Sequence, residues 1–201
     1  MFDANKITEL FDKLISDWHK KEYDIAGLDN QKGLKRLLVK LLFHNYTLWH
    51  LEDNARALNV SDSIIADVKR KIDRQNQLRN DTIELIDSFI EKKTLKLQKL
   101  KKAFAPTETL GAAIDRLSII SLKIFHMREE TLRKDADNSH INKCCDKLNV
   151  LQIQRSDLAG SINLTKEKIL SGELIHRIYR QMKMYNDPAL NPVLYKLKDK
   201  K

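Results

Sequence analysis

The chain has 201 residues, enough for one domain with a well-filled core, and its formal net charge at pH 7 is +9. Only five glycines and three prolines interrupt it, and its β-branched residues do not form alternating runs, so the composition favours an all-α fold. The lysine-rich stretches 91–102 and 196–201 carry +5 and +3 of the charge. The remainder is nearly neutral, which argues against a nucleic-acid-binding groove.

No segment predicts a signal peptide or a membrane span. The N-terminus MFDANKITEL lacks an apolar core, and no run approaches the roughly 18 apolar residues that a spanning helix needs. Cys144 and Cys145 are adjacent on a predicted helix, where their side chains diverge by about 100°, so we expect two buried, reduced thiols and no disulfide. These features predict a soluble, cytoplasmic protein, and no sequence pattern indicates a cofactor.

Apolar residues recur at helical spacing through most of the chain. The segments predicted to be helical are 4–21, a helix starting at 34, 61–100, 109–133, 138 to between 163 and 170, and 173–185. The second and fourth segments are apolar on opposite sides, which is typical of helices at the centre of a bundle. Pro106 ends the third segment, and Asp187-Pro188 ends the last one.

The chain also resembles itself at a constant offset of 76 residues. This offset aligns His50 with His126 and Arg79 with Arg155, together with several apolar positions. We therefore predict a single domain over residues 1–201, an all-α bundle of about six helices built from two pseudo-symmetric hairpins, 34–100 and 110–170. Residues 186–201 contain two X-Pro turns and are predicted to form an extended C-terminal strap that packs on the bundle through large apolar side chains.

Polar residues interrupt the apolar stripes where helices should pack. On a helical wheel, Asn45, Glu52 and Arg56 lie within about 20° of the line set by Leu34, Leu38 and Leu41. The corresponding stripe positions of later helices are Asn76, Arg79, Gln152 and Arg155, and Asp115-Arg116 lies on a helix that is apolar on both sides. An unpaired buried charge costs several kcal/mol, so these side chains require partners. Either a buried salt-bridge network or a site for a polar ligand would supply them.

Two His-carboxylate pairs at spacing i,i+3, His50/Asp53 and His126/Glu129, suit a metal. His50, however, lies about 140° from the line of Asn45 and Glu52, and the bridging carboxylates of bundle di-metal sites are missing. We therefore predict no metal site. Nucleophilic catalysis by either cysteine is not predicted, because neither has an evident positioned base.

Four stretches carry a family resemblance: NYTLWHLEDNAR, VKRKIDRQNQLRNDTIELID, TETLGAAIDRLSIISLKIFHM and YRQMKMYNDPALNPVLY. They resemble the motifs of the bacterial family known as domain of unknown function 4254, over about residues 38–195. The resemblance implies a helical protein and a role in envelope polysaccharide or lipopolysaccharide assembly, because such proteins are often encoded beside glycosyltransferases. It implies no specific reaction.

Two hypotheses follow. The first is a small-ligand protein or enzyme that acts on a phosphorylated or nucleotide-activated sugar, with arginines holding phosphate or carboxylate. The candidate ligand-binding residues are Asn45, Trp49, Glu52, Arg56, Asn76, Arg79, Asp115, Arg116, Arg155, Arg180, Lys183 and Asn186, and the catalytic candidates are Glu52 and Asp53. The second is a non-enzymatic partner or scaffold of a glycosyltransferase. A concave pocket lined by Glu52, Arg56 and Arg79 would favour the first, and a sealed polar network with an exposed apolar patch the second.

The first hypothesis makes two structural predictions. Glu52 and Arg79 should be mostly buried in one hydrogen-bonded network, because both occupy stripe centres of neighbouring helices. The C-terminal strap should bring Arg180, Lys183 and Asn186 towards that network.

Overall fold

The computed structural model describes residues 2–21, 32–95, 103–182 and 187–196. The helices are α1 (Ala4–Lys20), α2 (Gly33–Ala55), α3 (Asp62–Thr94), α4 (Leu110–Thr131), α5 (Asn138–Ser171) and α6 (Pro192–Tyr195). The first five are long, and α6 is one turn of four residues. Within the described residues the only β-pairing is an isolated bridge between Phe104 and Leu174. The prediction of a single all-α domain is confirmed.

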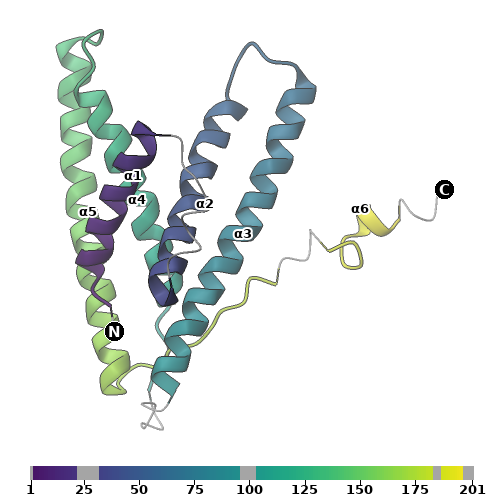
Figure 1. Cartoon of the computed structure of the whole chain (residues 1–201), viewed down its shortest axis with the longest axis vertical. Coiled ribbons are helices and arrows are strands. Elements are labelled where there is room, and N and C mark those ends of the chain that lie inside the picture. Colours follow the sequence, from purple (N-terminus) through teal and green to yellow (C-terminus); the bar gives the residue numbers. More distant parts are fainter. Residues whose placement is uncertain (1, 22–31, 96–102, 183–186, 197–201) are drawn as a thin grey trace.

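Two helical hairpins, α2–α3 and α4–α5, form the two arms of a V (Figure 1). The arms meet where α3 ends and α4 begins, and they diverge towards the two hairpin loops. Helix α4 contacts each of the other four long helices, as its two apolar sides predict.

Helix α1 packs against α4, α5 and α2 along one apolar face. Its buried residues Ile7, Phe11, Ile15 and Trp18 recur every three or four positions, which places them on one side of a helix. The Asp3 side chain caps the helix by accepting a hydrogen bond from the Asn5 backbone N–H at 2.8 Å. This face closes the core that the two hairpins share.

The N-terminus of α4 lies against α3 at Gly111. The Gly111 N–H donates a hydrogen bond to Asp87 Oδ1 at 2.7 Å, and the Thr109 side chain accepts one from the Ala112 N–H. A Cβ atom at Gly111 would lie 2.8 Å from the Ile83 carbonyl oxygen, so only glycine allows this approach. Asp87 thus joins the end of one hairpin to the beginning of the other.

The predicted sixth helix at 173–185 is wrong over its described part, residues 173–182. Gly172 adopts φ 83° and caps α5, and beyond it the chain is extended. The Ile175 N–H donates to the Phe104 carbonyl at 2.9 Å, and His176 is buried against Asp87, with Nε2 3.1 Å from its backbone oxygen. The Ile175 N–H is thus used in a tertiary hydrogen bond, and the His176 side chain holds the extended segment against α3.

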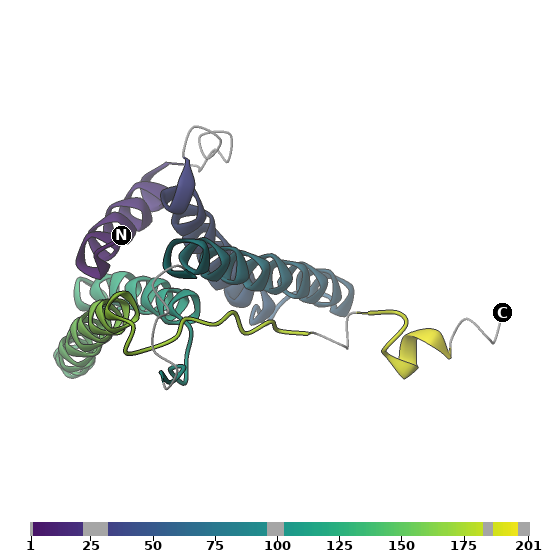
Figure 2. The ribbon, with the colours of Figure 1, turned by 90° about the horizontal axis from the view of Figure 1, so that it is seen from below.

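The C-terminal strap does not dock as predicted. Leu190, Val193 and Tyr195 are 50%, 69% and 39% exposed, and α6 lies away from the bundle in both views (Figures 1 and 2). The predictions for Tyr185 and for the lysine-rich stretch after Leu95 lie outside the described residues. None of the described helices is long and apolar enough to cross a membrane.

Candidate functional site

A pocket of about 360 Å³ opens between α2, α3 and α4. It is lined by Asn45, Leu48, Trp49, Glu52, Asp53, Arg56, Asn76, Arg79, Ile119 and Leu122, and we call it the polar pocket. Seven of these ten residues belong to the set predicted from the interrupted stripes and the family motifs. The structure therefore brings most of the predicted site residues to one place.

The floor of the polar pocket is a buried hydrogen-bonded group. Asn45 is 4% exposed, and its Nδ2 donates to Asp115 Oδ1 and to Ser118 Oγ, each at 2.7 Å. Burial raises the pKa of the Asp115 carboxyl, although Arg79 and Asn45 oppose the rise. With both donors of its amide in use, Asn45 acts as a fixed support for Asp115.

Arg79 lies between this floor and the pocket opening. Its Nε is 3.6 Å from Asp115 Oδ1, an ion pair too long for a hydrogen bond, and its side chain is 27% exposed. Among the described residues the buried Nε has no hydrogen-bond partner. The guanidinium is thus held near one carboxylate and still has donors to offer a ligand.

The predicted network between Glu52 and Arg79 is not formed. Glu52 pairs instead with Arg56 at 2.9 Å, and the two side chains are 45% and 69% exposed. A helical wheel gives the direction of a side chain on its own helix, but not how far the neighbouring helices cover it. The prediction of Glu52 and Arg56 as buried residues is wrong, although both line the polar pocket.

Other predicted residues lie away from the polar pocket. Arg155 of α5 binds Asp12 of α1 at 2.6 Å, and exposed Arg116 binds Glu108 at 2.9 Å. Arg180 pairs with Glu84 of α3 at 3.2 Å, so it stabilises the extended segment against α3. Lys183 and Asn186 lie outside the described residues.

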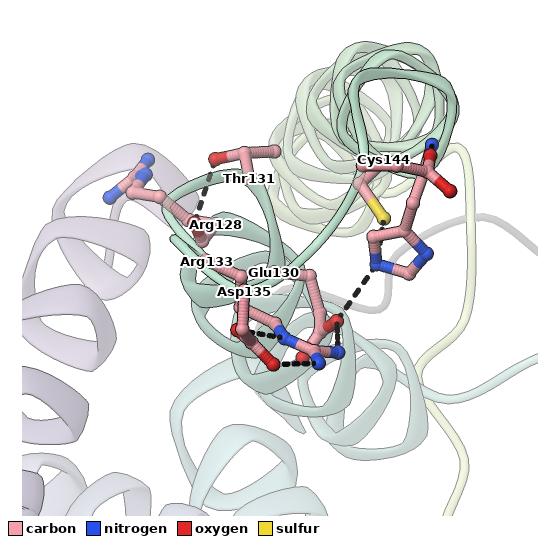
Figure 3. Close-up of polar contacts among 8 residues, drawn as sticks. Arg128, Glu130, Thr131, Arg133, Asp135 and Cys144 are labelled. Carbon is pink, nitrogen blue, oxygen red and sulfur yellow. Dashed lines mark hydrogen bonds and ion pairs between the residues drawn. The ribbon is translucent and has the colours of Figure 1, made fainter.

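The loop between α4 and α5 carries a second polar cluster (Figure 3). Arg133 binds Glu130 at 3.0 Å and Asp135 at 2.7 Å, and Glu130 also lies 3.0 Å from His140 Nε2. Cys144 is buried with its sulfur 3.4 Å from that same nitrogen, whereas Cys145 is exposed, contrary to prediction. One nitrogen cannot both donate to Glu130 and take a proton from Cys144, so the arrangement is no nucleophile-base-acid relay.

Two groups of described side chains could hold a metal ion. One is Glu130, His140 and Cys144, and the other is His19, His50 and His126. The i,i+3 pattern in the sequence points to His50 and His126 but not to His19. His19 follows the buried Ile15 by one helical turn, and this spacing on the α1 stripe is the signal that could have found it.

One comparison with known proteins gives a match. A model of a family described as protein of unknown function, DUF4254, matches residues 35–178. No curated protein and no solved structure matches the chain significantly. The match contains all of α2 except its first two residues, all of α3, α4 and α5, and every residue of the polar pocket. Because it spans well over half of the chain, this protein belongs to the DUF4254 family.

Proposed function

We propose that this protein binds a phosphorylated or nucleotide-activated sugar in the polar pocket, as a cytoplasmic participant in bacterial envelope polysaccharide or lipopolysaccharide biosynthesis. The pathway rests on the family resemblance alone. The ligand class is supported by the pocket, whose volume of about 360 Å³ is within the usual range for small-molecule sites. An open pocket containing Glu52, Arg56 and Arg79 is the arrangement expected of a ligand site.

The environment of Arg79 is the main observation that supports the proposal. Its side chain is mostly buried, and among the described carboxylates it pairs with Asp115 alone, at 3.6 Å. A phosphate group in the pocket would satisfy the remaining donors through bidentate hydrogen bonds, which are stronger than neutral ones. Asn76 and the exposed Glu52–Arg56 pair would add contacts to sugar hydroxyls or to a second phosphate.

Trp49 and the two adjacent carboxylates complete the proposed site. Trp49 lines the pocket and offers an aromatic surface to a sugar ring or base. Glu52 and Asp53 also line it and are the groups proposed to orient the ligand or to exchange protons with it.

A thermal-shift titration of the full chain tests the proposal, with inorganic phosphate, a hexose phosphate and a UDP-sugar as probes. A bound ligand raises the melting temperature in proportion to RT ln(1 + [L]/Kd). The variant Arg79→Lys keeps a cation beside Asp115 but cannot bind phosphate bidentately, so we expect at least about tenfold weaker binding. Arg74→Lys on the exposed surface of α3 is the matched control and should bind as wild type.

Two results would contradict the proposal. One is that none of the probes shifts the melting temperature. The other is a shift that Arg79→Lys and Arg74→Lys retain equally, because the ligand would then bind elsewhere.

A second candidate function is docking of a partner on the outer face of α5. Val150, Ile153 and Leu164 are 52%, 62% and 55% exposed, and their spacing places them on one side of the helix. A glycosyltransferase is the partner that the family resemblance favours. The test is co-purification of a glycosyltransferase with this protein. If Ile153→Asp abolishes the co-purification and Arg79→Lys does not, docking is supported over ligand binding.

We also infer that the two hairpins are copies of one ancestral unit. Helices α2 and α4 end 76 residues apart, and α3 and α5 begin 76 residues apart. The aligned pair His50 and His126 lie together, with ring centroids 6.0 Å apart. Matching ends and a shared contact support a two-fold relation between the hairpins.

A further inference from the structure

Three histidines from three different helices come together in one cluster. They are His19 near the end of α1, His50 of α2 and His126 of α4, and their ligand nitrogens all lie within 4.8 Å of one another. In each ring Nε2 is buried and has no hydrogen-bond partner among the described residues. Three unpaired acceptors in one place require an explanation, because buried polar atoms nearly always have partners.

In two of these histidines the contacts of the other ring nitrogen show where a ring proton lies. His19 Nδ1 lies 2.8 Å from the Ile15 carbonyl oxygen, and His126 Nδ1 lies 2.8 Å from Glu129 Oε2. A carbonyl and an ionised carboxylate only accept hydrogen bonds, so the proton of each ring is on Nδ1. A neutral ring with its proton on Nδ1 carries a lone pair on Nε2, where a metal ion can bind.

Aromatic neighbours hold the three rings in place. His19 stacks on Phe125 with centroids 4.2 Å apart, and His126 stacks on Trp49 at 4.5 Å with an angle of 11°. His50 meets Tyr46 edge-on at 4.6 Å.

We propose that His19, His50 and His126 bind one divalent transition-metal ion, with Zn²⁺ as the preferred ion, through their Nε2 atoms. A single cation accepts all three lone pairs. One water molecule has only two hydrogens to donate, and one shared proton joins only two nitrogens, so either leaves one acceptor unpaired. Neutral imidazole is the ligand that Zn²⁺, Cu²⁺ and Ni²⁺ prefer, and three histidines with one open position form a known zinc geometry.

The surroundings fit such an ion. Glu129 holds His126 through Nδ1, which is the usual way an outer carboxylate orients a metal-binding histidine. Asp53 and Glu129 both act electrostatically on His50 and would offset the charge of the metal. Zn–N bonds of 2.0–2.1 Å place ligand nitrogens about 3.4 Å apart, so binding would draw together nitrogens that lie within 4.8 Å of one another.

An ion can reach the cluster from one side. His126 is 21% exposed at its side chain and lines a groove of about 700 Å³ with Trp49, Met127 and Glu129. The histidine cluster is separate from the floor and from the arginines of the polar pocket, so the proposal does not rest on the proposed sugar ligand.

The test uses the full chain after dialysis against a chelator. Titration with Co²⁺ should give the visible absorption of tetrahedral nitrogen coordination at one equivalent, and Zn²⁺ should displace the Co²⁺. The melting temperature should rise with Zn²⁺ and not with Mg²⁺. His50→Gln should abolish the Co²⁺ spectrum.

Two matched variants remain informative even where His50→Gln does not fold. Glu129→Ala removes the carboxylate that accepts a hydrogen bond from His126. Glu130→Ala is the matched variant, because Glu130 is also a surface carboxylate in contact with a histidine. Glu129→Ala should weaken Zn²⁺ binding about 10- to 100-fold, whereas Glu130→Ala should leave it unchanged.

Two findings would overturn the site. Wild-type protein that gives no tetrahedral Co²⁺ spectrum at stoichiometric metal would remove the proposal outright. The other finding is that Glu130→Ala or His140→Gln abolishes metal binding and Glu129→Ala does not. The metal ion would then be bound by Glu130, His140 and Cys144 instead.

Discussion

At the residue scale, buried titratable groups on α2, α3 and α4 couple the fold to pH. His44 is 4% exposed, and burial together with the nearby Lys40 lowers its pKa from 6.5 to about 4. Asp87 and Asp115 have pKa values raised by burial. The histidine and the two carboxyls therefore change stability in opposite directions as pH changes.

We predict that His44 makes the protein less stable in mild acid. Between pH 6.5 and about 4 the unfolded chain binds a proton at this site that the folded chain does not, so the free energy of unfolding falls as pH falls through this window. The full effect is about 3 kcal/mol. The measurement is the free energy of unfolding in urea at several pH values. Its fall between pH 6.5 and about 4 should be larger for wild type than for His44→Gln.

The difference between the two proteins isolates His44, because Asp87 and Asp115 contribute equally to both. Raised carboxyl pKa values make stability fall as pH rises above 3.8, which is the opposite sign. Parallel pH profiles for wild type and His44→Gln would refute the prediction.

At the element scale, the chain after α5 divides into a docked part and an undocked part. Residues 174–181 reach α3 and the residues before α4 through His176, Arg180 and the backbone of Ile175. The described residues from 187 onward are mostly exposed. The two parts therefore differ in what they contribute to stability.

Two truncations should separate these contributions. Removing residues 187–201 should change the free energy of unfolding by less than about 0.5 kcal/mol, as for other surface changes. Removing residues 173–201 should cost about 2–4 kcal/mol, because it exposes the apolar contacts under Leu174 and leaves Asp87 without His176. Equal stability of the two shortened proteins, measured by urea unfolding, would show that the segment beside Asp87 is not needed.

At the scale of the whole molecule, α1 lies outside the family match and inside the core. The match begins at residue 35, yet Phe11, Ile15 and Trp18 are 0%, 1% and 7% exposed against the other helices. Burying the five apolar residues of this face contributes on the order of 10 kcal/mol. That is comparable to the entire net stability of a typical domain.

We therefore predict that residues 32–201 alone lose the native fold. Circular dichroism should still detect helix, but the thermal transition should become broad, and a hydrophobic dye should bind to the face of α4 that α1 had covered. Adding the α1 peptide in excess should partly restore a cooperative transition. A sharp transition at the wild-type temperature without the peptide would contradict this role of α1.

Local pattern predicted the helices well because each long helix carries a regular apolar stripe. The end of α1 and the start of α5 follow from the 3.6-residue period, as do five residues of the polar pocket: Asn45, Glu52, Arg56, Asn76 and Arg79. Trp49 and Asp53 follow from the family motifs instead. The extended path of residues 173–182 could not be predicted, because Gly172 and the contacts of His176 override the amphipathic pattern of this segment.

The exposure of Glu52 could not be predicted either, because a helical wheel gives the direction of a side chain and not the distance to the next helix. The histidine cluster was missed because α1 meets α4 only in the folded chain.

Trp49 gives the protein an optical reporter of its own. The chain has two tryptophans, and Trp18 is 7% exposed within the core. Trp49 lines both the polar pocket and the groove beside the histidines, and its indole stacks on His126. A paramagnetic ion such as Cu²⁺ on His126 would quench its fluorescence through this stacked contact, whereas a sugar ring against the indole would shift the emission wavelength by displacing water. A single emission spectrum therefore distinguishes occupancy of the two sites without a label.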